Sequence, residues 1–315
     1  MKTIPIIQYL PLTRPKAVKL FLKRLDNANV MSILDLEDSA QDPFSNHETI
    51  KLKANARAGL DMISKQVHHS ISSRLYIRIN SVDSPYYDDD IQSVINAYEN
   101  GLNITGVFVP KVENYSCIKD LHQQLSLINK NVEIVPMIET TRGMANLHDM
   151  LKNDKEANLF TRIHYGHFDY CLDAEIWPFK DPYHSDFWEI IKPIAQLLLN
   201  YNKTYIHTPF PFPADEDLFW SSSFYLQALF PSLDLWICTL NSELSISKQP
   251  VDCNPLKIIK PNTSKSYLIK EAKKICYNFL DGRANKRSFA VSGARFIPPH
   301  QYFAAKNYLK DVGED

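Results

Sequence analysis

The stretch that decides the fold is IVPMIETTRGM, which runs from Ile134 to Met144. Its first part is apolar up to Ile138, and it turns abruptly polar at Glu139. A continuous apolar run of this kind is typical of a strand buried on both faces of a parallel sheet. Because α/β folds place their chemistry at the carboxyl ends of such strands, Glu139 is predicted to reach a functional site.

A second carboxylate occupies an equivalent position further along the chain. The strand-like run TRIHYGHFD (161–169) closes with Asp169. Carboxylates at the ends of two neighbouring strands form a natural site for a hard divalent cation, so we predict that Glu139 and Asp169 bind Mg²⁺, with Mn²⁺ as the alternative ion. The other interpretation is that each acid only caps the helix that follows it.

The rest of the chain alternates short apolar runs with helical patterns. Including the two runs above, strands are expected at 3–10, 29–36, 74–80, 105–111, 134–138, 161–169, 203–210 and 233–240. Eight strand-then-helix units in this order predict an α/β protein with a (β/α)8 TIM barrel. A doubly wound open sheet is the alternative, but no glycine-rich phosphate loop follows the first strand, and the chain has only 8 glycines.

The sequence predicts one barrel domain over residues 1–245 and a C-terminal helical extension over 246–315. Residues 264–281 have the pattern of an amphipathic helix. The tail from 287 to 308 is expected to form a lid over the barrel or an oligomer contact.

Composition excludes several classes of function. A net charge of −1 gives no positive electrostatic field that would attract nucleic acid, and no apolar run is long enough for a transmembrane helix. The five cysteines are scattered without a CxxC pair, and the N-terminal residues lack the apolar core of a signal peptide. We therefore expect a soluble cytoplasmic protein with reduced thiols, no nucleic-acid partner and no membrane partner.

Charged residues follow the other predicted strands where each strand ends. Glu37 and Asp38 follow the second, Arg78 and Asn80 stand at the end of the third, and Lys111 ends the fourth. In a barrel all of them converge on one mouth. An arginine beside a metal suits the carboxylate of a 2-oxo acid, and such a site can stabilise an enolate. Two structural alternatives stay open, because Arg78 could form a buried salt bridge with Glu37 or Asp38, and Lys111 could lie along the barrel rim.

The same residues resemble a known family. LDLEDSA (34–40), with Lys53 and Ala56-Arg57 downstream, is similar to a signature of citrate lyase β-subunit-like (CitE-like) proteins. RIN (78–80), VPK (109–111), IETTRG (138–143) and GHFDY (166–170) resemble the next blocks in order. Five ordered blocks identify the first half of the chain as similar to the HpcH/HpaI aldolase and citrate lyase family.

The resemblance implies a (β/α)8 barrel, Mg²⁺ dependence, assembly as a homotrimer or homohexamer, and cleavage or formation of carbon–carbon bonds in 3-hydroxy acids or their CoA thioesters. A small oxo or hydroxy acid is then the expected partner. By position, Glu139 and Asp169 are implied as metal ligands and Arg78 as the group that binds the oxo-acid carboxylate. The acidic loop with Glu37 and Asp38 lies beside the site. The resemblance also implies that the backbone of Gly166, His167 and Phe168 would hold the substrate carboxylate.

The C-terminal part departs from the family pattern. ICTLNSE (237–243) stands where an IHPxQ block is expected, and SGARFIPP (292–299) stands where a block ending in a catalytic aspartate is expected. This departure argues against a CoA thioester substrate while leaving the metal half of the site whole. His207, His300 and Arg295 are the residues that could replace the missing acid.

Three functions are consistent with these observations. The first is a Mg²⁺-dependent carbon–carbon lyase or aldolase that forms or uses oxaloacetate, pyruvate or glyoxylate through an enolate. The second is a catalytically altered or silent barrel that serves as a binding or scaffold protein, which the missing aspartate favours. The third, a phosphoenolpyruvate-type barrel, is disfavoured because no phosphate-binding glycine loop is present.

Overall fold

The protein is described by a computed structural model. It describes residues 3–67, 74–126, 131–207, 211–240, 246, 248–283, 289–292 and 295–314. None of the helices within these ranges has the length and apolar character needed to cross a bilayer.

Eight parallel strands close into a barrel in chain order, which confirms the predicted fold class. The strands are β1 (Ile6–Pro11), β2 (Met31–Asp35), β3 (Leu75–Arg78), β4 (Gly106–Val109), β5 (Glu133–Ile138), β6 (Arg162–Tyr165), β7 (Thr204–His207) and β8 (Leu235–Thr239). Closure occurs where Ile7 of β1 pairs with Cys238 of β8. Parallel pairing of consecutive strands requires a crossover in each connection, and helices provide these crossovers.

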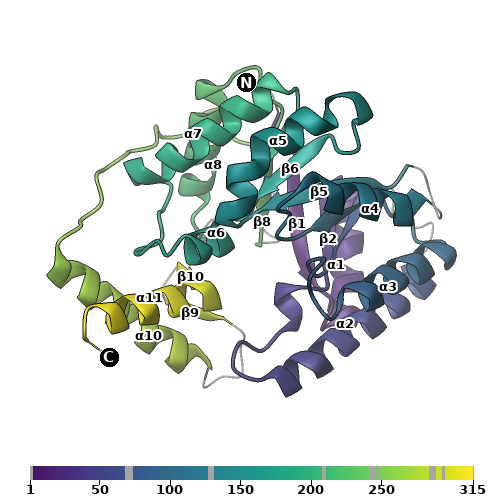
Figure 1. Ribbon diagram of the computed structural model, residues 1–315, viewed down its shortest axis with the longest axis horizontal. Coiled ribbons are helices and arrows are strands. Elements are labelled where there is room, and N and C mark those ends of the chain that lie inside the picture. The colour runs from purple at the N-terminus through teal and green to yellow at the C-terminus, as the bar shows by residue number, and fades with distance from the viewer. Residues whose placement is uncertain are drawn as a thin grey trace.

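The crossover helices surround the barrel (Figure 1). They are α1 (Pro15–Asn27), α2 (Asn46–Val67), α3 (Tyr87–Glu99), α4 (Tyr115–Ser126), α5 (Thr141–Ala157), α6 (His167–Asp173), α7 (Ser185–Asn200) and α8 (Glu216–Leu229). A short 3-10 turn, η1 (Asp38–Ala40), separates β2 from α2. The main apolar core lies between the strands and these helices, and a smaller one fills the barrel interior.

Alternation along the strands decides which residues fill the interior. Ile33 on β2, Tyr76 on β3 and Met137 on β5 belong to the interior core, whereas Leu34 and Ile77 belong to the outer core. Because successive side chains in a strand point to opposite faces, every second residue toward the mouth also faces inward. The same rule selects the residues of the site.

A C-terminal unit follows the barrel. It comprises α10 (Lys265–Arg283), β9 (Ala290–Ser292), β10 (Arg295–Ile297) and α11 (Pro299–Asp311), and it has an apolar core of its own. Figure 1 shows this unit on one side of the barrel, where α11 packs against α6. The predicted domain boundary at residue 245 lies outside the described residues, so it stays a prediction, as does the oligomer contact.

Candidate active site

Inward-facing residues at the carboxyl ends of the strands form the barrel mouth. Asp35 continues the inward series Met31 and Ile33 on β2, and Arg78 continues the series of Tyr76 on β3. Glu139 follows Met137 directly after β5 and is 2% exposed. The strand period therefore brings two acids and one arginine to the same end of the barrel.

Arg78 is held by carboxylates from β2 and the loop after it. Its Nε and Nη2 donate to the two oxygens of Asp35 at 2.7 and 2.8 Å, and its Nη1 donates to Asp38 at 2.9 Å. Arg78 lowers the pKa of Asp35 to about 2, although burial opposes the shift. The predicted buried ion pair therefore exists, but its main acid is Asp35, which the sequence analysis left without a role.

Glu37 lies beside this pair. Its Oε2 is 2.9 Å from Nη1 of Arg78, yet this buried atom accepts no hydrogen bond from any described residue. Burial, followed by the charge of Asp38, raises the pKa of Glu37 to about 7, against the effect of Arg78. Glu37 thus retains an oxygen able to exchange a proton near neutral pH.

A buried lysine fixes the backbone of the Glu37 loop. Lys53 of α2 is 2% exposed, and its Nζ donates to the carbonyls of Leu36 and Glu37 at 3.1 and 2.7 Å. It also donates to Oδ1 of Asn80 at 2.6 Å. Asn80, at the end of the third predicted strand, in turn donates to Asp90. It therefore links Lys53 and the Glu37 loop to α3.

Lys111 occupies the centre of the acidic mouth. Its Nζ lies 3.0 Å from Oδ1 of Asp169 and 3.6 Å from Oε1 of Glu37. Its backbone N–H donates to Oε1 of Glu139 at 3.0 Å. Lys111 adopts the left-handed conformation with φ of 53°, which is uncommon for a residue with a Cβ. This backbone conformation lets one residue contact three carboxylates. The alternative that Lys111 only lies along the barrel rim therefore describes part of its role.

Glu139 is packed against a glycine. A Cβ at Gly166 would lie 2.1 Å from Oε2 of Glu139 and 2.8 Å from its Cβ. Burial raises the pKa of Glu139 well above its usual range, and the charges of Asp169 and Glu37 add to this effect. Gly166 therefore makes the space in which a buried carboxylate lies close to other acids.

The predicted position of Asp169 requires a correction. The run 161–169 is not one strand, because β6 ends at Tyr165 and Asp169 lies in the first turn of α6. One reason is that β-branched residues are sparse after Ile163, and Gly166 supplies the break from which the helix starts. Asp169 still reaches the mouth, since its Oδ1 contacts Lys111.

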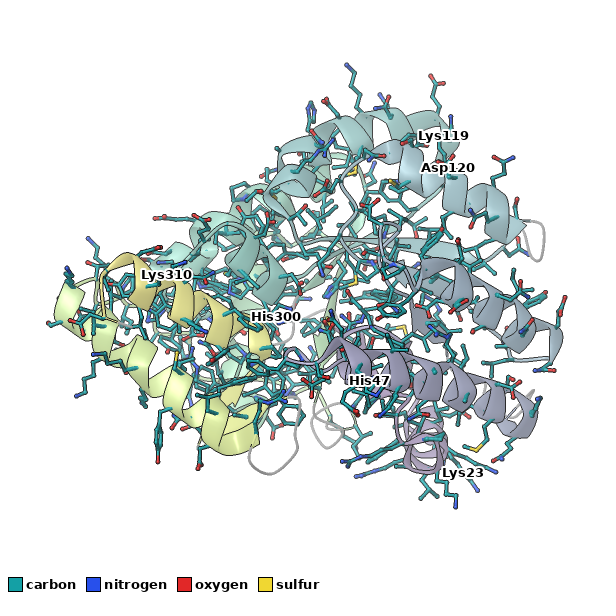
Figure 2. The ribbon with its side chains drawn as sticks, turned by 60° about the horizontal axis from the view of Figure 1, so that its bottom comes forward. Lys23, His47, Lys119, Asp120, His300 and Lys310 are labelled. Carbon is teal, nitrogen blue, oxygen red and sulfur yellow. The ribbon has the colours of Figure 1, made fainter. Side chains whose placement is uncertain are left out.

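His300, at the start of α11, reaches the same carboxylate from the C-terminal unit. Its Nε2 lies 3.2 Å from Oδ2 of Asp169. Burial alone would raise the pKa of Asp169, but His300 and Lys111 lower it below its usual range. In return, Asp169 raises the pKa of His300 to about 9 against the effect of burial. Figure 2 shows His300 at the end of α11 that faces the barrel.

The other two candidates for the missing acid lie elsewhere. His207 belongs to the outward face of β7, where it packs against Trp188 and Tyr205. Arg295 lies 3.5 Å from Asp181. Of the three candidates, His300 is the one that contacts the acidic mouth. The block ICTLNSE lies partly outside the described residues.

The GHFDY segment uses two of its side chains for packing. Nε2 of His167 lies 2.6 Å from the carbonyl oxygen of Lys180, and Phe168 stacks on Phe179. Burial lowers the pKa of His167 to about 4, so this imidazole is neutral at pH 7. The assignment of Gly166, His167 and Phe168 to a substrate carboxylate therefore concerns their backbone and stays a prediction.

A cavity of about 400 Å³ opens beside these groups. Lys111, Glu139, Asp169 and His300 form its charged wall. The remaining lining residues, most of which the sequence analysis did not single out, are Gln41, Pro43, Thr140, Leu172, Asp173, Pro299 and Phe303. Barrel loops and the C-terminal unit thus share one cavity of a size typical of small-molecule sites.

The mouth is chemically suited to a divalent cation. Five carboxylates, those of Asp35, Glu37, Asp38, Glu139 and Asp169, lie around the cationic side chains of Lys53, Arg78 and Lys111. With all of these groups ionised and His300 protonated beside Asp169, one negative charge remains in excess. Oxygen donors and excess negative charge are what Mg²⁺ and Mn²⁺ require. Three observations support this fit: the oxygen donors, the Oε2 atom of Glu37 that lacks a hydrogen-bond partner among the described residues, and the space that Gly166 leaves for the Glu139 carboxylate.

The fold and mouth define an α/β barrel with an acidic, arginine-containing centre at the carboxyl ends of its strands. The model of the HpcH/HpaI aldolase/citrate lyase family matches residues 8–198 of this chain. This chain belongs to that family, which confirms the resemblance carried by the five blocks.

Two curated relatives match parts of the chain. The malyl-CoA/β-methylmalyl-CoA/citramalyl-CoA lyase of Chloroflexus aurantiacus is 32% identical over 104 residues, which cover 31% of this chain and 29% of that protein. A citrate lyase subunit β-like protein of Deinococcus radiodurans is 27% identical over 146 residues, or 45% of this chain and 44% of the relative. The chain therefore matches less than half the length of either relative.

Solved structures share the fold. Malate synthase of Haloferax volcanii, in a pyruvate and acetyl-CoA ternary complex, is 14% identical with a TM-score of 0.72, covering 100% of this chain and 93% of that one. The citrate lyase β subunit of Mycobacterium tuberculosis, complexed with oxaloacetate and magnesium, is 15% identical with a TM-score of 0.55, covering 77% of this chain and 96% of that one. These likenesses support the fold alone.

Proposed function

We propose that this chain is a divalent-metal-dependent carbon–carbon lyase or aldolase. Its substrate is a 3-hydroxy acid or the CoA thioester of one, and its product or co-substrate is a 2-oxo acid such as oxaloacetate, pyruvate or glyoxylate. The observation that carries the proposal is the meeting of Glu139, Asp169 and Arg78 at one mouth beside a cavity. Membership of the family and the relative named as a malyl-CoA/β-methylmalyl-CoA/citramalyl-CoA lyase support the same reaction class.

Glu139 and Asp169 would hold the metal, Mg²⁺ or Mn²⁺. When bound, a divalent cation polarises the oxygens of an oxo or hydroxy acid and stabilises enolate charge. Burial of Glu139 and its contact with the Lys111 backbone fix its carboxylate before any ligand arrives.

Arg78 and Lys111 would neutralise the carboxylate of the substrate. Nη1 and Nη2 of Arg78 each use one N–H in the hydrogen bonds to Asp38 and Asp35, and Nη1 also lies 2.9 Å from Glu37, so the second N–H of Nη2 is the one offered to a substrate. Asp35 and Asp38 hold the guanidinium in place, and such a fixed fork favours a planar carboxylate.

Glu37 is the group that we assign to proton transfer. Its buried Oε2 has no hydrogen-bond partner among the described residues and lies beside Arg78. In cleavage, Oε2 would accept the proton of the 3-hydroxyl group as the carbon–carbon bond breaks. The bonding electrons remain on the departing fragment as an enolate, which must then gain a proton.

The direct test is a search for metal-dependent turnover. Purified protein is incubated with Mg²⁺ or Mn²⁺ and a panel of 3-hydroxy acids and their CoA thioesters, and released oxo acids are measured. Glu139→Gln should abolish release at unchanged circular dichroism, because the amide keeps the contact with Lys111 but lacks the charge for the metal. Absence of release from the whole panel would overturn the lyase assignment.

A catalytically silent binding protein is the second candidate. The observation in its favour is that Arg78 already has three hydrogen bonds to Asp35 and Asp38. Calorimetry separates the two functions, since the absence of metal and oxo-acid binding would favour the silent barrel, and tight binding of both would count against it. Assembly as a homotrimer or homohexamer is part of the main proposal, and native mass spectrometry would test it.

A further inference from the structure

A second group of possible metal ligands lies at the boundary between the barrel and the C-terminal unit. His300 is the second residue of α11, and its imidazole crosses this boundary to contact Asp169 of α6. Its side chain is 13% exposed. Its Nδ1 is a buried atom that forms no hydrogen bond with any described residue. A nitrogen donor of this kind is foreign to an all-oxygen magnesium site.

His300 belongs to a compact group of three residues that could bind one metal ion. One ligand atom from each of Asp38, Asp169 and His300 lies within 4.8 Å of the others. The three residues come from η1, α6 and α11, so three separate segments converge. Residues that share a metal ion must approach one another in this way.

A second observation points to a ligand at this place. Oε2 of Glu37, which precedes Asp38, is buried without a hydrogen-bond partner among the described residues. The ammonium of Lys111 lies 3.0 Å from Asp169 and 3.6 Å from Glu37, and Nη1 of Arg78 lies 2.9 Å from Oε2 of Glu37. With His300 neutral as a ligand, the five carboxylates of the mouth exceed the cations Lys53, Arg78 and Lys111 by two charges, so the mouth can accept a further cation.

We propose that His300 is a ligand of the metal at Asp169, supplied by the C-terminal unit, and that it gives this site a preference for divalent transition metals. Glu139, Asp169 and Asp38 would supply oxygen ligands, and His300 would supply nitrogen. This proposal rests on the proposed function, because it assumes the metal at Asp169. Imidazole favours Zn²⁺, Fe²⁺, Co²⁺ and Ni²⁺, whereas Mg²⁺ prefers oxygen donors in every position.

Ligation by His300 has a structural consequence. Because the metal would bridge α6 and α11, its binding is coupled to docking of the C-terminal unit on the barrel. A ligand that binds the docked form stabilises that form by mass action. Metal should therefore slow hydrogen exchange in α11 as well as in α6.

The experiment compares variants of the full chain by calorimetry with Mg²⁺ and, using a competing chelator, with Zn²⁺. His300→Gln should lower the Zn²⁺ affinity about 10-fold or more and change the Mg²⁺ affinity by less than about threefold, because one nitrogen donor is lost. His47→Gln is the matched control on the exposed start of α2, and it should behave as the wild type (Figure 2). His300→Asp replaces nitrogen by oxygen and should shift the preference toward Mg²⁺ while keeping a metal bound.

A spectroscopic measurement makes the outcome direct. Mn²⁺-loaded wild type should show a nitrogen coupling in electron spin echo experiments, and His300→Gln should lose it. A signal without nitrogen in the wild type, or equal Zn²⁺ affinities for His300→Gln and His47→Gln, would overturn the proposal. Failure of the proposed function is a separate result, namely no Mg²⁺ binding in the wild type and no effect of Glu139→Gln on either metal.

Discussion

Nε2 of His300 lies 3.2 Å from Oδ2 of Asp169, so the start of the last helix touches the acidic mouth of its own barrel. The two residues are far apart in sequence, and the contact joins two units with separate apolar cores. The cavity beside the mouth is therefore lined by α11 together with the barrel loops. The lid role of the tail stays a prediction.

The first prediction concerns the pH dependence of stability in metal-free protein. The pKa of His300 is raised from 6.5 to about 9 in the folded state, chiefly by Asp169 against burial. The folded state then holds a proton that the unfolded state loses, so this stabilisation is complete below pH 6.5 and is lost as the pH rises through 9. The upper limit of the effect is about 3 kcal/mol.

Urea unfolding between pH 6 and 9.5 checks this prediction. His300→Gln should flatten the decline in the free energy of unfolding, and His47→Gln should keep the slope of the wild type. A decline of the same size in His300→Gln would show that other groups cause it.

Sequence periodicity was enough to predict the barrel but did not place every residue of its mouth. The eight strands were each visible as apolar runs, since a strand covered on both faces carries a strong local signal. Asp35 could also have been found, because it continues the inward alternation of Met31 and Ile33. The contact of His300 could not, because it depends on how a separately folded unit docks, which no local pattern encodes.

The second prediction concerns the packing of Glu139 against Gly166. Gly166→Ala places a methyl group 2.1 Å from Oε2 of Glu139 and 2.8 Å from its Cβ. The backbone at Gly166 has φ of −89° and ψ of 92°, so alanine is strained only by this contact. We expect a loss of about 1–3 kcal/mol in the free energy of unfolding, together with weaker metal binding.

A double-mutant cycle isolates the clash between these residues. In a Glu139→Gly background the Cβ and carboxylate are both gone, so Gly166→Ala should cost about 1 kcal/mol or less. An equal cost in both backgrounds would mean that Gly166 is constrained by something other than Glu139.

The third prediction concerns the buried ammonium of Lys53. Lys53→Met keeps much of the side-chain volume but leaves the carbonyls of Leu36 and Glu37 without this donor. We expect the free energy of unfolding to fall by about 3 kcal/mol, because hydrogen bonds from a buried charged group are lost. Lys51→Met, on the exposed face of the same helix, breaks only a surface pair with Glu48 and should cost about 0.5 kcal/mol or less.

Lys53 also shows why sequence reasoning undervalues some functional residues. Its spacing with Ala56, Leu60 and Ile63 puts it on the buried face of α2, where a lysine is unusual. That position signals a buried partner, but it does not identify one. Two of its three partners are backbone carbonyls of the loop after β2, which leave no trace in residue types, and the third is the side chain of Asn80.

The last prediction concerns how the C-terminal unit is held in place. Phe44, in the loop after β2, contacts the rings of Phe279, Tyr302 and Phe303 with centroid distances of 6.2, 5.6 and 5.7 Å. The guanidinium of Arg283 lies over its ring. Phe44→Ala removes these ring contacts, each of the kind worth about 0.5–1.5 kcal/mol, from the boundary between the two units. Opening of the C-terminal unit should therefore become at least about fivefold more frequent, while the barrel core is unaffected.

Hydrogen exchange in α10 and α11 measures this opening, and Phe21→Ala on the exposed side of α1 is the matched control. Unchanged exchange in α11 of Phe44→Ala would mean that the contacts with α6, including that of His300, hold the unit without Phe44.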